Sequence, residues 1–322
     1  MHLLEEAVRH ALAAWSLGRS ADIALLSVSE NATFLLSDYE NDRRLVLRVH
    51  RPGYHSEAEI RSELAWIVAL RADGGVVAPA PLAGADGAPV QWLRVDEHGA
   101  LAAVAFEYVA GVEPAEENLG LTFHALGAIA ARLHRHARGW ARPPGFRRKT
   151  WDFASMLGEQ PLWGTWRAAP GLDKAGVALL DRVALILRER LFRFGTEPDR
   201  FGLIHADLRL ANLLADGDRL GVIDFDDCGF GWFAYDFAAA VSFFENDPAV
   251  PALLAAWLDG YRLVAPFPRT AEAEIPAFVM LRRMLLLAWI GSHPEASAAQ
   301  ALRDRYAAGT LALADDFLSR YG

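Results

Sequence analysis

The spacing of apolar residues changes character about one third of the way along the chain. From residue 24 to about residue 109, short apolar runs such as LVLRVHR and LAAVAFEYV are separated by Gly, Asp and Asn, which is typical of strands joined by turns. After Gly111 the apolar positions recur at helical intervals over long stretches. The pattern therefore predicts a small β-rich region followed by a larger, mostly helical one.

One helix is predicted inside the β-rich region, over residues 56–71. Ser56 is a favoured N-cap residue and acidic side chains follow in the first turn. The apolar positions then follow one helical face: Ile60, Leu64, Ile67 and Leu70. A further amphipathic helix is predicted at the N-terminus, where Glu5, Glu6 and Arg9 interrupt the apolar residues.

The second region is predicted to contain long helices at residues 121–136, 179–192, 250–263, 275–290 and 298–318. Between the second and third of these lies the segment GLIHADLRLANLLADGDRLGVIDFDDCGF, whose short apolar runs flank an Asp-Gly-Asp turn. On one of the helices His134 and His136 fall on different faces, so this part is predicted to be a mixed exposed surface.

The length of 322 residues fits two parts, since a domain has roughly 150 residues. We place the parts at residues 1–108 and 109–322 and predict an α+β fold. The single cysteine, Cys228, excludes an intrachain disulfide and every multi-cysteine zinc pattern.

The charge balance disfavours nucleic-acid and membrane partners. With 32 Lys and Arg against 41 Asp and Glu, the net charge is −9, so a broad basic surface is not expected. The N-terminus lacks the uninterrupted apolar core of a signal peptide, and apolar runs such as residues 284–290 fall short of the roughly 18 to 20 residues that span a bilayer. We expect a cytoplasmic protein.

The strongest chemical signal is a pair of motifs rich in oxygen-bearing side chains. His205, Asp207 and Asn212 form the pattern H-x-D-x-x-x-x-N, and Asp224-Phe225-Asp226 begins twelve residues after Asn212. Phosphoryl transfer needs a carboxylate that orients an attacking hydroxyl and accepts its proton, together with oxygen ligands for Mg²⁺. The two motifs supply both.

On these motifs the chain resembles the aminoglycoside phosphotransferase and choline kinase group of the protein-kinase-like superfamily. Within it the chain is similar to the branch of stress response kinase A and the type II homoserine kinases. The resemblance runs from residue 29 to about residue 247, with its specific motifs in residues 203–238. It implies a two-lobed fold, with a small β-rich N-terminal lobe that binds nucleotide, a large helical lobe for catalysis and substrate, and the cofactors ATP and Mg²⁺.

The resemblance assigns roles to the motif residues. Asp207 matches the proposed general base, His205 supports its loop, and Asn212 and Asp224 match the Mg²⁺ ligands. Asp226 stands where protein kinases have glycine. It is either a second metal contact or a turn residue that accepts hydrogen bonds.

Two further residues of this segment are assigned by the same resemblance. Asp236 matches an aspartate that accepts hydrogen bonds from the catalytic-loop backbone. Arg209 either stabilises the transferring phosphoryl group or forms an ion pair with Asp224 or a surface acid.

In the N-terminal lobe the resemblance implies a cation on the nucleotide phosphates, paired with a helix glutamate. Arg48 is the best match, although lysine is usual there, and its alternative is a surface strand residue. Glu63 is the expected partner and Glu59, one turn earlier, competes with it. The glycine-free turn SENATF, residues 29–34, would offer backbone N–H groups to phosphate.

FEYVAG, residues 106–111, matches the hinge that meets adenine. Backbone groups of Glu107 and Val109 would make the hydrogen bonds. The alternative is a buried edge strand that enters a turn.

The acceptor is indicated only weakly. Three tryptophans in residues 151–167 fall in a segment that related kinases use to wall the acceptor site, and aromatic and acidic residues follow the metal motif: Trp232, Phe244, Glu245 and Asp247. Together they suit an ammonium group. For each of them alone, packing in the core or a solvated turn is the competing interpretation.

We therefore predict an ATP- and Mg²⁺-dependent phosphotransferase that acts on a hydroxyl of a small, amine-bearing molecule, with Asp207 as base. A protein serine/threonine kinase resembling stress response kinase A is the first alternative. A nucleotide-binding module without turnover, motivated by Arg48 in place of lysine, is the second.

Overall fold

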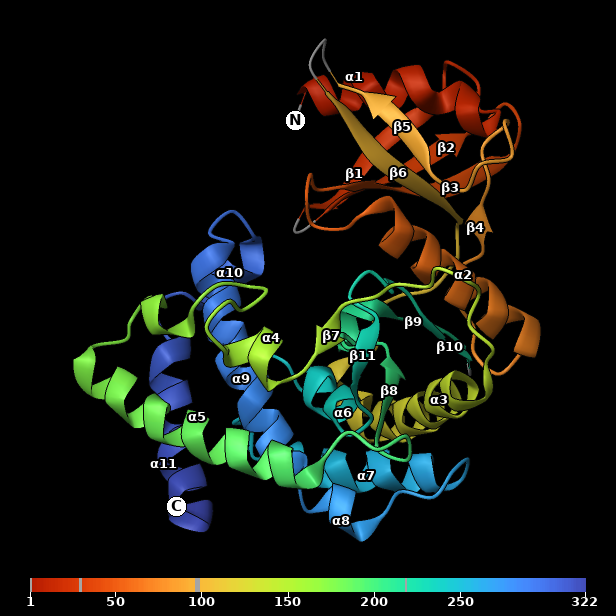
Figure 1. Ribbon diagram of the computed structural model, residues 1–322. Coiled ribbons are helices and arrows are strands. Elements are labelled where there is room, and N and C mark those ends of the chain that lie inside the picture. The colour runs from red at the N-terminus through yellow and green to blue at the C-terminus, as the bar shows by residue number, and fades with distance from the viewer. Residues whose placement is uncertain (1, 29–30, 96–98, 218) are drawn as a thin grey trace. The chain divides into compact units, whose positions relative to one another are not determined.

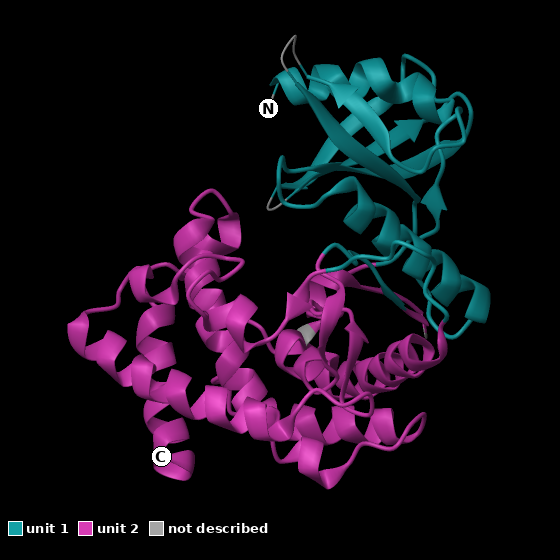
Figure 2. Ribbon diagram, in the orientation of Figure 1, with its two compact units in different colours: residues 1–111, 141–148, 221–226 teal, residues 112–140, 149–220, 227–322 magenta. Residues whose placement is uncertain are grey.

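The computed structural model describes residues 2–28, 31–95, 99–217 and 219–322, and it consists of two compact units (Figures 1 and 2). Unit 1 contains residues 1–111, 141–148 and 221–226, and unit 2 contains residues 112–140, 149–220 and 227–322. The short segment 221–226 of unit 1 carries Asp224 and Asp226, which are thus folded together with the N-terminal part of the chain.

Unit 1 is built on an antiparallel sheet (Figure 1). Its strands follow the order β1-β2-β3-β6-β4, and β5 also pairs with β6. The strands are β1 (Asp22–Val28), β2 (Asn31–Asp38), β3 (Arg43–His50), β4 (Pro81–Leu82), β5 (Gln91–Arg94) and β6 (Ala100–Glu107).

The two faces of this sheet have different chemistry. On one face, α1 (His2–Ala11) and the short helix η1 (Leu12–Trp15) pack on buried apolar side chains that include Leu47 and Val49 of β3. Because successive side chains of a strand point to opposite faces, Arg48 lies on the other one. A charged side chain is thereby placed away from the apolar core of unit 1.

The helix predicted over residues 56–71 is confirmed as α2 (Glu57–Asp73), and the predicted N-terminal helix is α1. Ser56 caps it by accepting a hydrogen bond from the backbone of Glu59, whose side chain accepts one from the backbone of Ser56. Gly74, in the left-handed conformation with φ 70°, ends the helix.

Unit 2 is mostly helical, as predicted, and its predicted helices are confirmed with one exception. Residues 298–318 form two helices with a break at residues 303–305. In the second of them, the carbonyl oxygen of Tyr306 and the hydroxyl of Thr310 accept hydrogen bonds from Arg283. The helices are α3 (Leu119–Gly139), α4 (Phe153–Leu157), α5 (Lys174–Phe194), α6 (Tyr235–Ala240), α7 (Val250–Arg262), α8 (Arg269–Glu272), α9 (Ile275–Ser292), α10 (Ser297–Leu302) and α11 (Tyr306–Tyr321), with short 3₁₀ helices η2 (Glu116–Asn118), η3 (Trp166–Ala168) and η4 (Leu210–Asn212).

Glycines allow α3 and α7 to pack with their backbones in contact. A Cβ atom on Gly127 would lie 1.9 Å from the carbonyl oxygen of Trp257, and one on Gly260 would lie 1.8 Å from that of His124. Larger residues at these positions would force the helices apart.

Short strands flank the motif that contains His205, Asp207 and Asn212. They form a sheet of order β7-β11-β8 and a separate hairpin, β9-β10, as the turn signals predict. The strands are β7 (Thr150–Trp151), β8 (Phe201–Ile204), β9 (Leu213–Asp216), β10 (Arg219–Val222) and β11 (Gly229–Trp232). Residues 205–209, which include Asp207, form the loop between β8 and η4.

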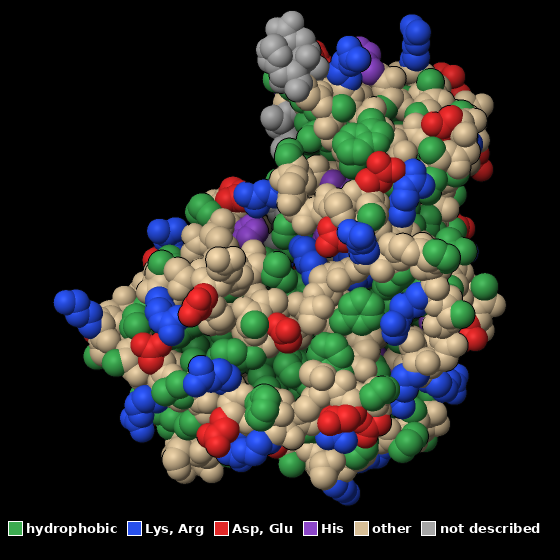
Figure 3. Space-filling model, viewed as in Figure 1, with side chains coloured by type: hydrophobic (Ala, Val, Ile, Leu, Met, Phe, Trp, Pro, Cys, Tyr) green, Lys and Arg blue, Asp and Glu red, His purple; other side chains and the backbone are tan. Residues whose placement is uncertain are grey.

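The stretch Arg269–Ser292 has the length and composition of a membrane-spanning helix, but 78% of its most apolar window is buried inside the protein. Such burial is typical of a core helix. On the face shown in Figure 3, acidic and basic side chains of the described residues are interspersed in both units.

Candidate active site

The loop that carries Asp207 has a strained backbone. Ala206 adopts φ 67°, a left-handed conformation that costs a non-glycine residue about 1 kcal/mol or more. The buried carboxylate of Asp236, in the first turn of α6, accepts the backbone N–H groups of His205 at 3.3 Å and Ala206 at 2.8 Å. The expected role of Asp236 is confirmed by these bonds.

A buried histidine supports Asp236 from behind. His134 Nε2 lies 2.9 Å from Asp236 Oδ2, and its Nδ1 lies 3.0 Å from the hydroxyl of Tyr261. Burial lowers the pKa of His134, and this outweighs the attraction of Asp236, so the ring is neutral and donates from Nε2. The prediction of an exposed surface was wrong for His134, because α7 covers this face of α3 and supplies Tyr261.

Both oxygens of the Asp207 carboxylate are bound by side chains. Oδ2 accepts Nε of Arg209 at 3.1 Å and Nδ2 of Asn212 at 2.7 Å, and Oδ1 accepts Nη2 of Arg282 at 2.6 Å. We call Asp207, Arg209, Asn212 and Arg282 the Asp207 cluster. Burial acts to raise the pKa of Asp207, but the guanidinium groups of Arg209 and Arg282 outweigh it and hold that pKa below its ordinary value. The carboxylate is therefore ionised at neutral pH.

The other motif residues of unit 2 adjoin this cluster. The backbone N–H of Asp207 donates to Nδ1 of His205 at 3.3 Å. Arg209 bonds to Asp207 itself, a partner that neither of its two interpretations had named. Asn212 also donates to the carbonyl oxygen of Asp207 at 2.9 Å, so its two N–H donors both point to Asp207 and its Oδ1 is left as an acceptor.

Sequence reasoning missed Arg282. It lies 75 residues after Asp207 on α9, and its side chain is only 3% exposed. The one signal for it is the pair Arg282-Arg283 in the otherwise apolar run VMLRRMLLLAW, where two buried charges demand partners.

In unit 1, Arg48 is surrounded by carboxylates. Its Nη2 lies 2.6 Å from Glu63 Oε2 and 3.5 Å from Asp226 Oδ1, and its Nη1 lies 3.4 Å from Asp224 Oδ1. We call these four residues the Arg48 cluster. Arg48 is 5% exposed, which excludes the surface interpretation, and Glu63 rather than Glu59 is its helix partner. Burial acts to lower the pKa of Arg48. The neighbouring carboxylates have the larger effect, so the pKa of Arg48 is raised above its ordinary value.

The two acids of the second motif have different surroundings. Asp226 is buried, and its Oδ2 accepts Nδ2 of Asn31 at 2.8 Å and lies 3.3 Å from Nε2 of His55. Burial raises the pKa of Asp226, but Arg48 and the histidines outweigh it and hold that pKa well below its ordinary value. The side chain of Asp224 is 47% exposed, on a residue with φ 59°.

The predicted hinge, residues 106–111, lies in unit 1, and the predicted phosphate turn is described only in part. The backbone N–H of Glu107 donates to the carbonyl oxygen of Ala80 at 2.8 Å and is thus used inside unit 1, and Val109 is half-buried after the end of β6. Ser29 and Glu30 of the predicted phosphate turn lie outside the described residues.

The residues expected to wall the acceptor site are mostly part of the core of unit 2. Among them the following are buried: Trp151, Trp163, Trp166, Trp232 and Glu245. Glu245 forms an ion pair with Arg283 at 2.6 Å, so its charge is already neutralised within the protein. The ring of Trp163 lies over the guanidinium of Arg282, and its centroid is 5.5 Å from Cζ of Arg282.

The structure thus gathers the predicted residues into two groups. Arg48, Glu63, Asp224 and Asp226 lie together in unit 1, and His205, Asp207, Arg209 and Asn212 lie together in unit 2.

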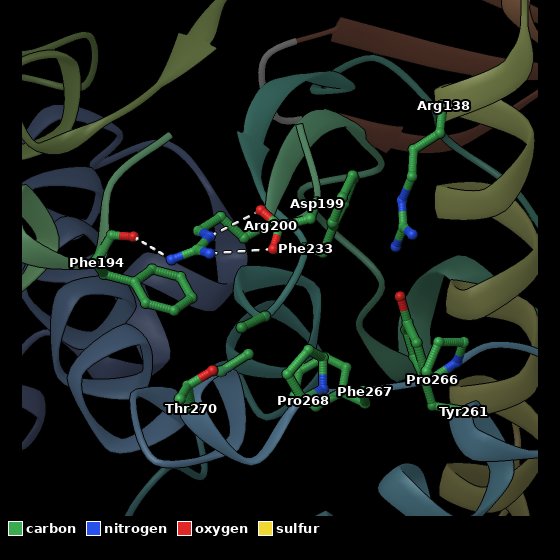
Figure 4. Close-up of a pocket in the computed structure, with 12 residues that line it drawn as sticks. Arg138, Phe194, Asp199, Arg200, Phe233, Tyr261, Pro266, Phe267, Pro268 and Thr270 are labelled. Carbon is green, nitrogen blue, oxygen red and sulfur yellow. Dashed lines mark hydrogen bonds and ion pairs between the residues drawn. The ribbon is translucent and has the colours of Figure 1, made fainter. Parts of the chain in front are cut away.

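A pocket elsewhere in unit 2 is lined by residues that do not fit the predicted phosphoryl transfer (Figure 4). Its walls carry Arg138, Arg200 and several aromatic rings, and its acid, Asp199, is bound by Nε of Arg200 at 2.9 Å. Tyr261 connects the pocket wall to His134. The arrangement offers structural support for Asp236 and no group poised for phosphoryl transfer.

Comparisons with known proteins identify the family and the fold of the chain. The phosphotransferase enzyme family matches residues 23–272. A microcompartment-associated aminopropanol kinase is similar in structure, with 43% identity, coverage of 99% of this chain and 98% of that chain, and a TM-score of 0.91. The amicoumacin kinase hAmiN, in complex with AMP-PNP, Ca²⁺ and Ami, shares the fold at 22% identity, with coverage of 96% and 93% and a TM-score of 0.79.

A curated homoserine kinase of Methylobacillus flagellatus is 32% identical over 52% of this chain and 49% of its own length. The structural likenesses span nearly the whole chain and confirm the predicted α+β, protein-kinase-like fold.

Proposed function

The chain belongs to the phosphotransferase enzyme family, and we propose that it transfers the γ-phosphoryl group of ATP, with Mg²⁺, to the hydroxyl of a small amino alcohol. The predicted resemblance to this family is confirmed, and its named relatives make the chain a phosphotransferase that acts on hydroxyl groups of small molecules. The identity of donor, metal and acceptor is the part that we propose.

The Asp207 cluster is the observation that carries the proposal. An ionised carboxylate with a fixed orientation can accept a hydrogen bond from the acceptor hydroxyl and direct its oxygen at the γ-phosphorus. As the new P–O bond forms, the bond to the β,γ-bridging oxygen breaks and ADP leaves. The hydroxyl proton passes to Asp207.

Nucleotide binding is assigned to unit 1. Glu63 holds Arg48 in one orientation, so its guanidinium is ordered before phosphate arrives, and a planar fork suits phosphate oxygens. Backbone groups near Glu107 and Val109 are proposed to meet adenine. Since the N–H of Glu107 is already used, its carbonyl oxygen and the backbone of Val109 are the groups that we assign to this role.

Two motif residues have the chemistry that a Mg²⁺ site requires. Asn212 keeps its Oδ1 as an acceptor, and Asp224 has a half-exposed carboxylate. Asp226 fits less well, because Asn31, Arg48 and His55 surround its oxygens. When bound, Mg²⁺ would neutralise charge on the nucleotide phosphates. A relative of the same fold was solved with AMP-PNP and Ca²⁺, which agrees with a nucleotide and a divalent cation.

An amine on the acceptor is supported by the likeness to aminopropanol kinase over 99% of the chain. The net charge of −9 also favours a cationic substrate over an anionic one. The ammonium is not assigned to the predicted tryptophans or to Glu245, since these are buried and engaged within unit 2.

The test is ADP release from Mg-ATP with a panel of acceptors: aminopropanol, ethanolamine, homoserine, hydroxylysine, aminoglycosides and a generic protein. Propanediol is the matched control, because it replaces the amino group of aminopropanol by a hydroxyl. We expect aminopropanol to exceed propanediol about tenfold or more in kcat/KM, as for loss of one charged hydrogen bond. Asp207→Asn should lower kcat by about 10²- to 10⁴-fold.

Other results would support the two alternative functions. Turnover with the protein acceptor alone would identify a protein kinase, and ATP binding without any turnover would identify a nucleotide-binding module. Equal rates with aminopropanol and propanediol would retain the phosphotransferase and refute the amine requirement.

A further inference from the structure

Arg282 is the member of the Asp207 cluster that no sequence motif indicates, and its contacts converge on the catalytic loop. Besides Asp207, its Nη1 reaches the carbonyl oxygen of Ala206 at 3.4 Å and the hydroxyl of Tyr235 at 3.2 Å, and its Nε donates to Ser242 at 2.9 Å. One planar group therefore ties α9 to the loop and to the region of α6.

The peptide groups around Ala206 are held from two sides. Its N–H donates to Asp236 and its carbonyl oxygen accepts from Arg282. Since Ala206 has the unfavourable φ of 67°, both contacts act on the residue whose backbone directs Asp207.

Among the described residues, the hydrogen-bond partners of Asp207 leave one acceptor position of its carboxylate open. An ionised carboxylate has about four acceptor positions, two on each oxygen. Arg209 and Asn212 fill those of Oδ2, while Arg282 takes one of those on Oδ1. The open position on Oδ1 is thus next to the Arg282 bond.

We propose that Arg282 is a positioning residue of the transfer reaction, which fixes the Asp207 carboxylate so that the open position of Oδ1 receives the acceptor hydroxyl. The proposal rests on the proposed function, in which Asp207 accepts the proton of that hydroxyl. Removal of Arg282 would let the carboxylate rotate about its side-chain bonds, and misplacement by about 1 Å can lower a rate about 10²-fold.

The neighbouring arginine provides a matched control. Arg283 is also 3% exposed and also buries its guanidinium in hydrogen bonds, but its partners are Glu245 at 2.6 Å, Thr310 at 2.9 Å and the carbonyl oxygen of Tyr306 at 3.0 Å. These contacts connect α9 with α11 and the loop after α6, and among the residues that the structure describes none of them involves an atom of Asp207. A purely structural role predicts the same outcome for both arginines.

The experiment compares Arg282→Met, Arg282→Lys and Arg283→Met in the full chain, with kcat measured per folded molecule at saturating aminopropanol and Mg-ATP. We expect Arg282→Met to lower kcat about 100-fold and leave the affinity for ATP within about twofold, because the Arg48 cluster is untouched. Arg282→Lys should lose about tenfold, since one ammonium cannot replace the fork toward Ala206, Ser242 and Asp207. Arg283→Met should lose stability while its kcat stays within about threefold.

A crystal structure of Arg282→Met completes the test, because it does not depend on the acceptor. The Asp207 side chain should leave the rotamer in which Oδ1 faces position 282. An unchanged rotamer, or equal losses of kcat in Arg282→Met and Arg283→Met, would overturn the proposal. If Arg282→Met does not fold, an unchanged kcat in Arg282→Lys overturns it. Absence of turnover in the wild type counts against the proposed function only, and the rotamer then decides the role of Arg282.

Discussion

The Arg48 cluster of unit 1 and the Asp207 cluster of unit 2 use the same kinds of side chain in opposite arrangements. In the first, one guanidinium is surrounded by the carboxylates of Glu63, Asp224 and Asp226. In the second, one carboxylate is surrounded by two guanidinium groups and an amide. Each cluster holds its central group in the charged form and in one orientation.

The difference follows from what each centre must bind in the proposed reaction. Phosphate oxygens require a cation that stays protonated, and neighbouring carboxylates raise the pKa of Arg48. A hydroxyl proton requires an ionised acceptor, and Arg209 with Arg282 lowers the pKa of Asp207 against the effect of burial. A lower pKa makes Asp207 a weaker base, so its contribution is orientation more than basicity.

The largest expected effect is that of removing the cation from the Arg48 cluster. Arg48→Met would leave Glu63, whose side chain is fully buried, without a countercharge, and breaking such a pair costs about 3 to 5 kcal/mol. Urea unfolding and an ATP titration would show lower stability and weaker nucleotide binding. Arg48→Lys is the control and should keep most of the stability and most of the affinity for ATP. Unchanged stability in Arg48→Met would refute the clustering of charges in unit 1.

Removal of one acid from the same cluster should have a smaller effect. In Glu63→Gln the guanidinium keeps Asp224 and Asp226, so we expect a loss of about 1.5 to 3 kcal/mol together with weaker ATP binding. Glu59→Gln is the matched control on the same helix. It weakens the cap with Ser56, which is worth about 1 kcal/mol, and should leave ATP binding unchanged. Equal effects on ATP binding would contradict the pairing of Arg48 with Glu63.

The buried His134, which contacts Asp236, predicts that the stability of the protein depends on pH. Burial holds the pKa of His134 below its ordinary value of 6.5, so the unfolded chain takes up a proton at this residue before the folded one does. The stability from a neutral His134 is present above pH 6.5 and is lost as the pH falls below it, by at most about 1.4 kcal/mol per pH unit.

Urea unfolding at pH 7 and pH 5 measures this loss. His134→Gln should show a smaller loss than the wild type, whereas His136→Gln, on the same helix and half-buried, should match the wild type. If both variants keep the wild-type pH dependence, His134 is not the group that titrates.

The smallest effect concerns the hydroxyl that touches His134. Tyr261→Phe removes the hydrogen bond at 3.0 Å and leaves the ring in the core, so we expect a loss of about 1 kcal/mol and little change in kcat. A large fall in kcat without a fall in stability would show that the pocket beside Tyr261 acts on the catalytic loop. Thermal unfolding and a single saturating assay distinguish the two outcomes.

The sequence predicted the parts of the fold that depend on local pattern. Helix α2 follows from the Ser56 cap and apolar residues on one face, and Asp207 precedes Asn212 and Asp224 at the spacing that indicates phosphoryl transfer. The sequence did not reveal that His134 is buried. The polarity of a helix face does not show whether another helix packs against it.

By itself the sequence determined the order of the long helices, the motif on which the proposed reaction rests, and the family, since all three depend on residues close together along the chain. Only the tertiary structure decided which charges meet. Glu63 rather than Glu59 holds Arg48, and Arg282 reaches Asp207 across 75 residues of sequence. The physical reason is that a buried charge requires a partner in space, while the sequence gives no distance between residues that are far apart along the chain.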